Sequence, residues 1–201
     1  MKVLVVGGTG TIGAAVVDAL RAAGHEVRTA ERSGGELQVD MRSTQSVQAM
    51  LAQAGRVDAI MSCAGSGAWK PLAELSDDDF ETSLHYKLMG QVNLARYGAD
   101  SLADGGSVTL TSGVLASEPM PGSAAISLVN AGLEGFVRAA ALEMPRGVRV
   151  NVVSPPWVSE TLQAMGQDPS GGMPAADVAR AYVDAVTATY TGQVVDARRF
   201  A

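Results

Sequence analysis

Short apolar runs alternate with longer amphipathic stretches along the whole chain. Runs rich in valine, leucine and isoleucine are typical of buried strands, whereas apolar residues spaced three and four apart are typical of helices with one buried face. The apolar runs predict seven strands, at residues 2–6, 25–30, 36–39, 56–61, 106–111, 148–153 and 192–195. The amphipathic stretches predict helices at residues 11–24, 44–54, 76–102, 123–143 and 174–189.

This alternation predicts an α/β fold. Strands that follow one another through helices pair in parallel, and right-handed crossovers place the helices on both faces of the sheet. We therefore expect a doubly wound parallel sheet, a Rossmann fold, of about seven strands. No domain linker, repeat or low-complexity segment interrupts the pattern, so residues 1–201 are expected to form a single domain. Residues 161–173 are irregular and rich in Gly, Ser, Pro and Gln, which predicts a small, mobile substrate loop at about 159–174.

The first strand ends at a glycine cluster that leads directly into the first helix. Gly7, Gly10 and Gly13 are spaced three apart. In a strand–turn–helix unit, one such glycine turns the chain, one lets the backbone approach a pyrophosphate, and one lets the helix pack on its strand. The free N–H groups at the helix start then face the phosphates. The sequence thus predicts a dinucleotide site formed by Gly7, Thr9, Gly10, Thr11, Ile12 and Gly13.

Composition narrows the possible partners. The net charge is −6 and no basic cluster is present, so neither nucleic acid nor an anionic membrane is expected. The sequence contains no apolar run of 18 residues and no signal-peptide pattern, so we expect a cytoplasmic protein. Cys63 is the only cysteine, which excludes an intrachain disulfide. A small-molecule substrate is the expected partner, and no metal site is predicted.

Further motifs follow in an order that resembles the short-chain dehydrogenase/reductase family over nearly the full chain. Asp40 follows the third strand, where the family has an adenine-contacting acid, and Ser62–Gly65 stands where the family usually has Asn-Asn-Ala-Gly. Ser112 closes the fifth strand like the family's active-site serine. Residues 151–158 resemble the segment along the nicotinamide, with Pro156 where Gly is usual. The resemblance implies cofactor contacts from Asp40, Met41, Cys63, Ala64, Gly65, Pro155 and Val158.

Cofactor choice depends on the residues that follow the second strand. Glu31 stands where an acid usually bonds the ribose 2′-hydroxyl, which favours NAD(H). Arg32 and Ser33 come next, where the family often binds a 2′-phosphate, which favours NADP(H). We expect a slight preference for NADP(H), because Arg32 and Ser33 can form a phosphate pocket while Glu31 turns out to solvent.

The resemblance also implies four catalytic positions, which the family usually fills with Asn, Ser, Tyr and Lys. Tyr exchanges a proton with the substrate oxygen, Lys lowers the pKa of Tyr and binds the ribose, Ser orients the substrate oxygen, and Asn holds a water. Aligned on the motifs, these positions carry Lys87, Ser112, Ile126 and Asn130. Isoleucine has no transferable proton, so the usual acid–base step cannot run at position 126.

Two interpretations of these four positions are open. Either the site has decayed, or Lys and Asn have exchanged places and Ser112, Lys87 and Asn130 form an atypical catalytic set. We favour the exchange, with Lys87 three residues beyond Leu84 on the buried side of its helix and close to Ser112. A desolvated Lys87 would have a lowered pKa and could act as the acid. Tyr86 is an alternative phenol, but it lies about 100° away around the helix.

The expected function is that of an NAD(P)(H)-dependent oxidoreductase of a small carbonyl or alcohol. The alternatives are a dinucleotide-binding protein without redox turnover, such as a sensor or pseudoenzyme, and a non-redox dehydratase or cyclase. Ile126 and Trp157 are expected to line the substrate pocket, and Cys63 to be a small buried hydrophobe rather than a reactive thiol. Family resemblance and the small residues in the helix at 123–143 imply a homodimer or homotetramer.

Overall fold

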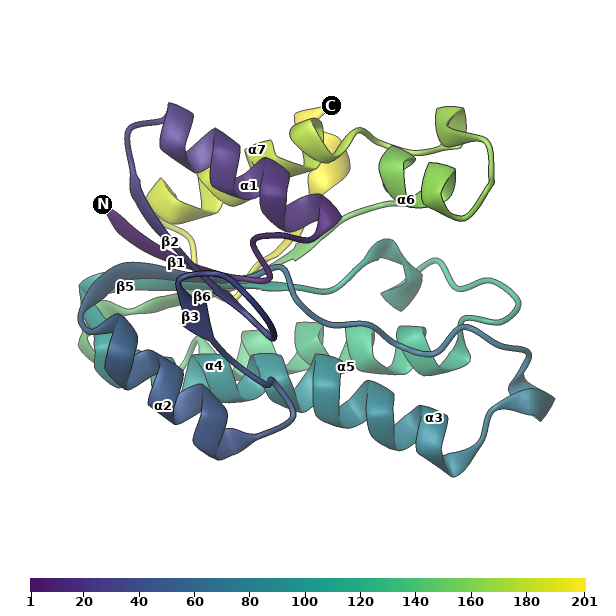
Figure 1. Cartoon of the computed structure of the whole chain (residues 1–201), viewed down its shortest axis with the longest axis horizontal. Helices are drawn as coiled ribbons and strands as arrows, with labels where there is room; N and C mark the ends of the chain where they lie inside the picture. The colour runs from purple at the N-terminus through teal and green to yellow at the C-terminus, as the bar shows by residue number, and fades with distance from the viewer.

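The computed structural model describes all 201 residues and forms a three-layer α/β domain (Figure 1). Seven parallel strands make one sheet in the order β3-β2-β1-β4-β5-β6-β7, as the alternating pattern predicted. The strands are β1 (Lys2–Val6), β2 (Glu26–Glu31), β3 (Leu37–Gln38), β4 (Val57–Ser62), β5 (Leu102–Thr111), β6 (Arg149–Ser154) and β7 (Val194–Asp196). The order reverses between β1 and β4, and such a reversal opens a crevice at the carboxyl ends of the strands.

Helices cover both faces of this sheet (Figure 1). One face carries α1 (Thr11–Ala22) and α7 (Ala175–Thr187), and the other carries α2 (Thr44–Ala54), α4 (Gly90–Gly98) and α5 (Ala124–Ala140). Each face has its own apolar core, because the inner strands point alternate side chains to opposite sides. None of the helices combines the length and the apolar character needed to cross a bilayer.

The long helix predicted over residues 76–102 is not continuous. It begins as α3 (Asp77–Thr82), widens into a π-helical segment at Ser83–Met89, and continues as α4 and a 3-10 turn at Ala99–Ser101. A π-helical insertion adds a residue to the turn and rotates the side chains that follow. As a result, Ser83 and Lys87 are buried, whereas Leu84 and Leu88 of the predicted apolar stripe are only half-buried.

The segment predicted as an irregular substrate loop is more ordered than expected. A short helix, α6 (Ser159–Ala164), occupies its start, and a 3-10 turn follows at Pro169–Gly171. Its two ends are joined, because the N–H of Met173 donates to the carbonyl of Trp157 at 2.8 Å and the N–H of Ser159 donates to the carbonyl of Met173 at 3.0 Å. The expectation of irregular structure across this segment was therefore wrong in part, since those hydrogen bonds close it into a compact loop.

Candidate active site

The glycine turn between β1 and α1 has the geometry of an anion site. A Cβ at Gly13 would lie 1.9 Å from the carbonyl oxygen of Gly7, so only glycine lets the helix pack this closely on the turn. Gly7 itself has a φ of +84°, which favours glycine. The helix starts at Gly10 without a side-chain cap, and the N–H groups of Thr11, Ile12 and Gly13 have no protein acceptor. These unpaired donors at a helix N-terminus fit the pyrophosphate of a dinucleotide.

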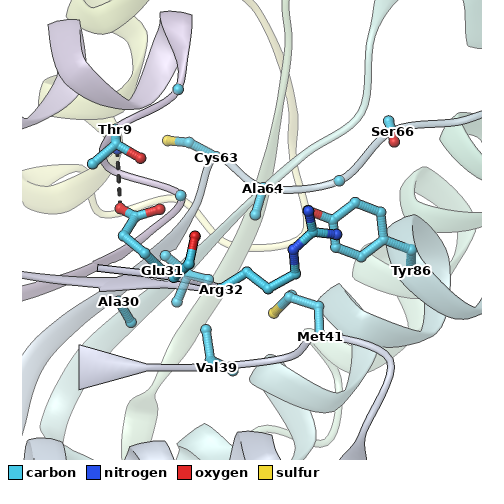
Figure 2. Close-up of a pocket in the computed structure, with 15 residues that line it drawn as sticks. Thr9, Ala30, Glu31, Arg32, Val39, Met41, Cys63, Ala64, Ser66 and Tyr86 are labelled. Atoms are coloured by element: carbon cyan, nitrogen blue, oxygen red, sulfur yellow. Dashed lines mark hydrogen bonds between the residues drawn. The ribbon is translucent and has the colours of Figure 1, made fainter. Parts of the chain in front are cut away.

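A cleft of about 490 Å³ opens beside this turn (Figure 2). It lies at the crevice between β1 and β4 and is open to solvent on one side. Ten of the predicted cofactor residues line it, namely Gly7, Thr9, Gly10, Glu31, Arg32, Ser33, Met41, Cys63, Ala64 and Gly65. Ser66 and Tyr86 also line it and were not predicted as cofactor contacts.

Glu31 does not turn out to solvent as the sequence argument assumed. Its side chain is buried, with an exposed fraction of 7% for the residue, and one carboxylate oxygen accepts a hydrogen bond from the N–H of Thr9 at 3.0 Å (Figure 2). The glycine turn therefore fixes Glu31 in place, because an N–H of the turn needs an acceptor there. The other carboxylate oxygen accepts no hydrogen bond from the protein, so it is free to bind a ribose hydroxyl.

The mouth of the cleft is basic rather than acidic. Arg32 is exposed, and Figure 2 shows its side chain reaching across the cleft toward Tyr86.

The predicted adenine-contacting residue, Asp40, does not line the cleft. Its carboxylate accepts two hydrogen bonds from the Arg42 guanidinium, at 3.0 and 3.1 Å. These hydrogen bonds hold the pKa of Asp40 below its usual value. The contact of Asp40 with an adenine therefore stays a prediction, and its side chain is held by Arg42 in this structure.

Cys63 lies where the cleft meets the inner part of the site. Burial, with a smaller contribution from the charge of Glu31, raises the pKa of its thiol to about 12. A thiol with such a pKa stays protonated at neutral pH and is a poor nucleophile. This supports the interpretation of Cys63 as a small apolar residue rather than a reactive one.

A smaller inner pocket of about 190 Å³ adjoins the cleft and shares Cys63 and Gly65 with it. It lies at the carboxyl ends of β5 and β6, where a nicotinamide extended from the glycine turn would point. Ten of its sixteen lining residues were predicted as site residues, namely Ile12, Cys63, Gly65, Lys87, Ser112, Ile126, Asn130, Pro155, Trp157 and Val158. No aspartate or glutamate lines this pocket.

Lys87 reaches the inner pocket from the π-helical segment. The residue is 7% exposed, and its ammonium donates to the backbone carbonyl of Ser112 at 3.2 Å. Gln91, one turn further on, fixes this arrangement by bonding both the N–H and the carbonyl of Thr111 at 2.7 and 3.0 Å. Burial lowers the pKa of Lys87 to about 8. The predicted approach of Lys87 to Ser112 is found, and Gln91 is a positioning residue that the sequence argument missed.

The Ser112 hydroxyl has a partner that the sequence did not reveal. It donates to a carboxylate oxygen of Glu134 at 3.1 Å, and Glu134 in turn lies 3.6 Å from the Arg138 guanidinium. Glu134 is one helical turn beyond Asn130 on α5, so its reach to the end of β5 follows from the packing of that helix. The hydroxyl of Ser112 is therefore hydrogen-bonded to Glu134, and it is the backbone carbonyl oxygen of Ser112 that accepts from Lys87.

Asn130 has one satisfied and one unsatisfied polar atom. Its Nδ2 donates to the carbonyl of Gly113 at 3.4 Å, whereas its Oδ1 is buried without a hydrogen-bond partner. A buried acceptor without a partner costs about 1–3 kcal/mol, unless a ligand supplies a donor. Ile126 lies on the same helix, lines the same pocket and contributes only apolar surface. The pocket thus offers one buried cation and one unpaired acceptor.

The site contains backbone and side-chain groups that suit an organic cofactor. No group of three or more His, Cys, Asp or Glu side chains lies close enough to bind a metal ion. The residues that could hold a nicotinamide dinucleotide are the unpaired N–H groups of Thr11, Ile12 and Gly13 for the pyrophosphate and the free carboxylate oxygen of Glu31 for a ribose.

Comparisons with known proteins agree with this reading. Residues 8–195 match the family profile described as enoyl-(acyl carrier protein) reductase, a branch of the short-chain dehydrogenases/reductases. A hydroxynaphthalene reductase of Aspergillus fumigatus is 30% identical over 152 residues, which cover 73% of this chain and 53% of that protein. The chain thus spans about half the length of this curated relative.

Solved structures match the whole fold. The protein lin1944 from Listeria innocua superimposes with a TM-score of 0.93 at 39% identity, over 98% of both chains. A small-chain dehydrogenase in complex with NADPH gives a TM-score of 0.86 at 28% identity, over 98% of this chain and 95% of the other. With the strand order, the glycine turn and the matched profile taken together, this chain belongs to the short-chain dehydrogenase/reductase family of oxidoreductases.

Proposed function

We propose that the protein is an NAD(P)(H)-dependent oxidoreductase of a small carbonyl or alcohol, in which Lys87 replaces the family's tyrosine as the proton donor. The buried ammonium of Lys87 in the inner pocket is the observation that carries this proposal. Burying an ammonium with a single carbonyl acceptor costs stability. A site that only binds a neutral, unreactive ligand would be more stable without this group.

When bound, the nicotinamide supplies or accepts the hydride at the substrate carbon. In the reducing direction, the Lys87 ammonium donates a proton to the carbonyl oxygen as the C=O bond becomes a C–O single bond. The neutral amine that remains takes a proton back from solvent. A pKa of about 8 suits this role, because a general acid works best when its pKa is near the working pH.

Asn130 is proposed to use its unpaired Oδ1 as acceptor for a hydroxyl of the bound ribose or alcohol. The cofactor is proposed to be NADP(H) rather than NAD(H), because Arg32 and Ser33 line the mouth of the cleft. The NADPH bound to a structural relative supports this preference. Glu31 keeps NAD(H) binding possible, since its free carboxylate oxygen can accept from a 2′-hydroxyl.

A panel of aldehydes, ketones and quinones, followed at the reduced-nicotinamide absorbance band with NADPH and with NADH, tests the proposal. We expect turnover with at least one class, and a loss of about 100-fold or more in kcat for Lys87→Met. Lys2→Met, at an exposed lysine of β1 that lines neither the cleft nor the inner pocket, is the control and should keep full activity. Equal activity of Lys87→Met and wild type would contradict the role of Lys87.

A second candidate is a dinucleotide-binding protein without turnover. The engagement of the Ser112 hydroxyl by Glu134 and the apolar side chain of Ile126 favour it, since both remove groups that the family uses in catalysis. Under this alternative, NADP(H) would raise the melting temperature but no carbonyl compound would oxidise the reduced cofactor. The same panel therefore separates the two functions.

A further inference from the structure

Two tryptophans from different loops pack against each other, and one of them lines the inner pocket. Trp157 follows β6 and lines the pocket, and Trp69 comes from the loop between β4 and α3. Their rings lie edge to face, with centroids 5.3 Å apart and planes at 69°. Trp69 is 40% exposed, although it is one of the largest apolar side chains in the protein. Trp157 is half-buried, so the pair is partly open to solvent beside a pocket, which indicates a contact surface rather than core packing.

The loop that carries Trp69 is fixed on both sides. The N–H of Lys70 donates to the carbonyl of Gly122 at 3.1 Å, and the N–H of Ala68 donates to the Ser83 hydroxyl at 2.9 Å. The Lys70 ammonium also bonds the carboxylate of Asp79 at 2.8 Å. These bonds connect the loop to the segment before α5 and to the start of the long helix. Trp69 is thus positioned by the fold, because its neighbours on both sides are tied.

The same loop covers the wall where the family's tyrosine would stand. A Cβ at Gly67 would lie 2.7 Å from Cδ1 of Ile126, so the backbone at Gly67 packs directly on that side chain. The segment after β6, by contrast, is short and closed on itself by the bonds between Trp157 and Met173. The β4–α3 loop thus packs on Ile126, one wall of the inner pocket, while the segment after β6 lines another wall.

We propose that Trp69 and Trp157 form an aromatic subsite and that the substrate is a flat, aromatic or conjugated carbonyl compound. This inference rests on the proposed function, since it names the substrate class of the same pocket. The pocket is about 190 Å³ in volume, below the 300–1,000 Å³ usual for drug-sized ligands, so the substrate is small or only partly enclosed.

The walls of the pocket fit such a substrate. Apart from Lys87 and Asn130, the lining combines apolar side chains such as Leu115, Ile126 and Pro156 with the small hydroxyl side chains of Thr111, Ser112 and Thr161. No carboxylate lines the pocket, so a cationic substrate finds no counter-charge there. A flat ring between the tryptophans and these side chains would place its carbonyl toward the Lys87 ammonium, the one charged donor in the lining.

The chain offers a direct readout, because Trp69 and Trp157 are its only two tryptophans. Intrinsic tryptophan fluorescence therefore reports on this subsite alone. The experiment titrates the NADP⁺-loaded protein, which cannot reduce a carbonyl, with benzaldehyde and with cyclohexanecarbaldehyde, a non-aromatic probe of similar size. We expect benzaldehyde to quench the fluorescence and to bind about three- to tenfold more tightly than cyclohexanecarbaldehyde, in line with a single aromatic contact.

Substitutions in the loops complete the test. Trp69→Leu should abolish the preference for benzaldehyde and leave the affinity for cyclohexanecarbaldehyde unchanged. Trp69→Phe, which keeps an aromatic ring, should keep most of the preference for benzaldehyde. Leu72→Ala, at a residue of the same loop that is 70% exposed, is the matched control. Thermal melting with NADP⁺ checks that each variant is folded and binds the cofactor.

Equal affinities for the two aldehydes in the wild-type protein would overturn the subsite, as would an unchanged preference in folded Trp69→Leu. Because the titration needs no turnover, it separates the two proposals. Tight binding of benzaldehyde without its reduction by NADPH would contradict the proposed function and leave the subsite standing. Reduction of aliphatic carbonyls by NADPH with no preference for benzaldehyde would contradict the aromatic subsite and leave the proposed function standing.

Discussion

The Lys87 ammonium meets one protein acceptor, the carbonyl of Ser112, and no carboxylate lines its pocket. Burial brings its pKa from the usual 10.5 to about 8, so the charged form is less stable in the folded protein than in the unfolded chain. Functional groups often carry such a cost, because a site that binds and reacts is rarely optimal for stability.

Lys87→Met should therefore stabilise the cofactor-free protein at pH 7, by about 1–3 kcal/mol in the free energy of unfolding. Between pH 8 and 10.5 the unfolded wild-type chain binds more protons than the folded one, so wild-type stability rises with pH there. The advantage of the variant should shrink over this window and vanish above it. Thermal or urea unfolding at pH 7 and pH 10 measures both effects. A less stable variant at pH 7 would mean that Lys87 is a structural residue.

Arg32 is the residue proposed to select the cofactor. Its side chain lies across the mouth of the cleft, next to Ser33. An arginine paired with a phosphate typically contributes about 1.5–3 kcal/mol as a charge-assisted hydrogen bond. We expect Arg32→Ala to weaken NADPH binding about 10-fold or more and NADH binding much less. Calorimetric titration of both cofactors gives the comparison, and an equal loss for both would show that Arg32 does not bind the 2′-phosphate.

Among the elements, the turn between β1 and α1 and the π-helical segment at Ser83–Met89 place the site. The turn leaves three N–H groups unpaired at the helix start, and the π-helical segment rotates Lys87 toward β5. Unpaired backbone N–H groups and π-helical insertions are both common at functional sites.

The turn makes a sharp prediction at Gly13. A Cβ there would overlap the carbonyl of Gly7, so Gly13→Ala should displace α1, lower the melting temperature and weaken cofactor binding by at least 10-fold. Gly171→Ala is the control, because a Cβ at Gly171 meets nothing within 4 Å and its backbone does not require glycine. Melting curves with and without NADP(H) give both quantities. Normal binding by Gly13→Ala would refute the role of the turn.

The sequence predicted the elements better than it predicted their details. The strands and the glycine turn were predictable, since short β-branched apolar runs such as Val3–Val6, bounded by glycine, are typical of buried parallel strands. The π-helical segment was not predictable, because no sequence pattern marks where the hydrogen bonds of a helix change from the α to the π type. Two hydrogen bonds of the site, Ser112 to Glu134 and the Thr9 N–H to Glu31, join elements that are distant in sequence. Periodicity contains no information on such pairs.

At the scale of the whole molecule, α5 leaves an apolar strip uncovered. Small or apolar residues face solvent along it, namely Ala124, Leu128, Ala131, Gly135 and Ala139, with Arg138 as the one exposed charged residue among them, and Leu142 just beyond the helix is 87% exposed. At Gly135 a Cβ would meet nothing within 4 Å, so a partner helix could approach closely. We propose that this strip is covered by a second copy of the chain.

Light scattering at micromolar concentration should then give the mass of a homodimer or homotetramer. Gly135→Glu should shift the protein toward the monomer, because it places a charge in the centre of the strip. Arg21→Glu, at an exposed position on α1, is the control and should leave the mass unchanged. A wild-type monomer would contradict the assembly.

The pH dependence of hydride transfer tests directly whether Lys87 is the proton donor. The rate of NADPH oxidation should be constant at low pH and fall as pH rises through about 8, since only the ammonium form can donate. Oxidation of the corresponding alcohol should show the opposite limb, because it needs the neutral amine. Lys87→Arg, which keeps the charge but does not deprotonate in this range, should lose the transition near pH 8. A wild-type profile that is flat from pH 6 to 10, or a transition that persists in Lys87→Arg, would contradict the account.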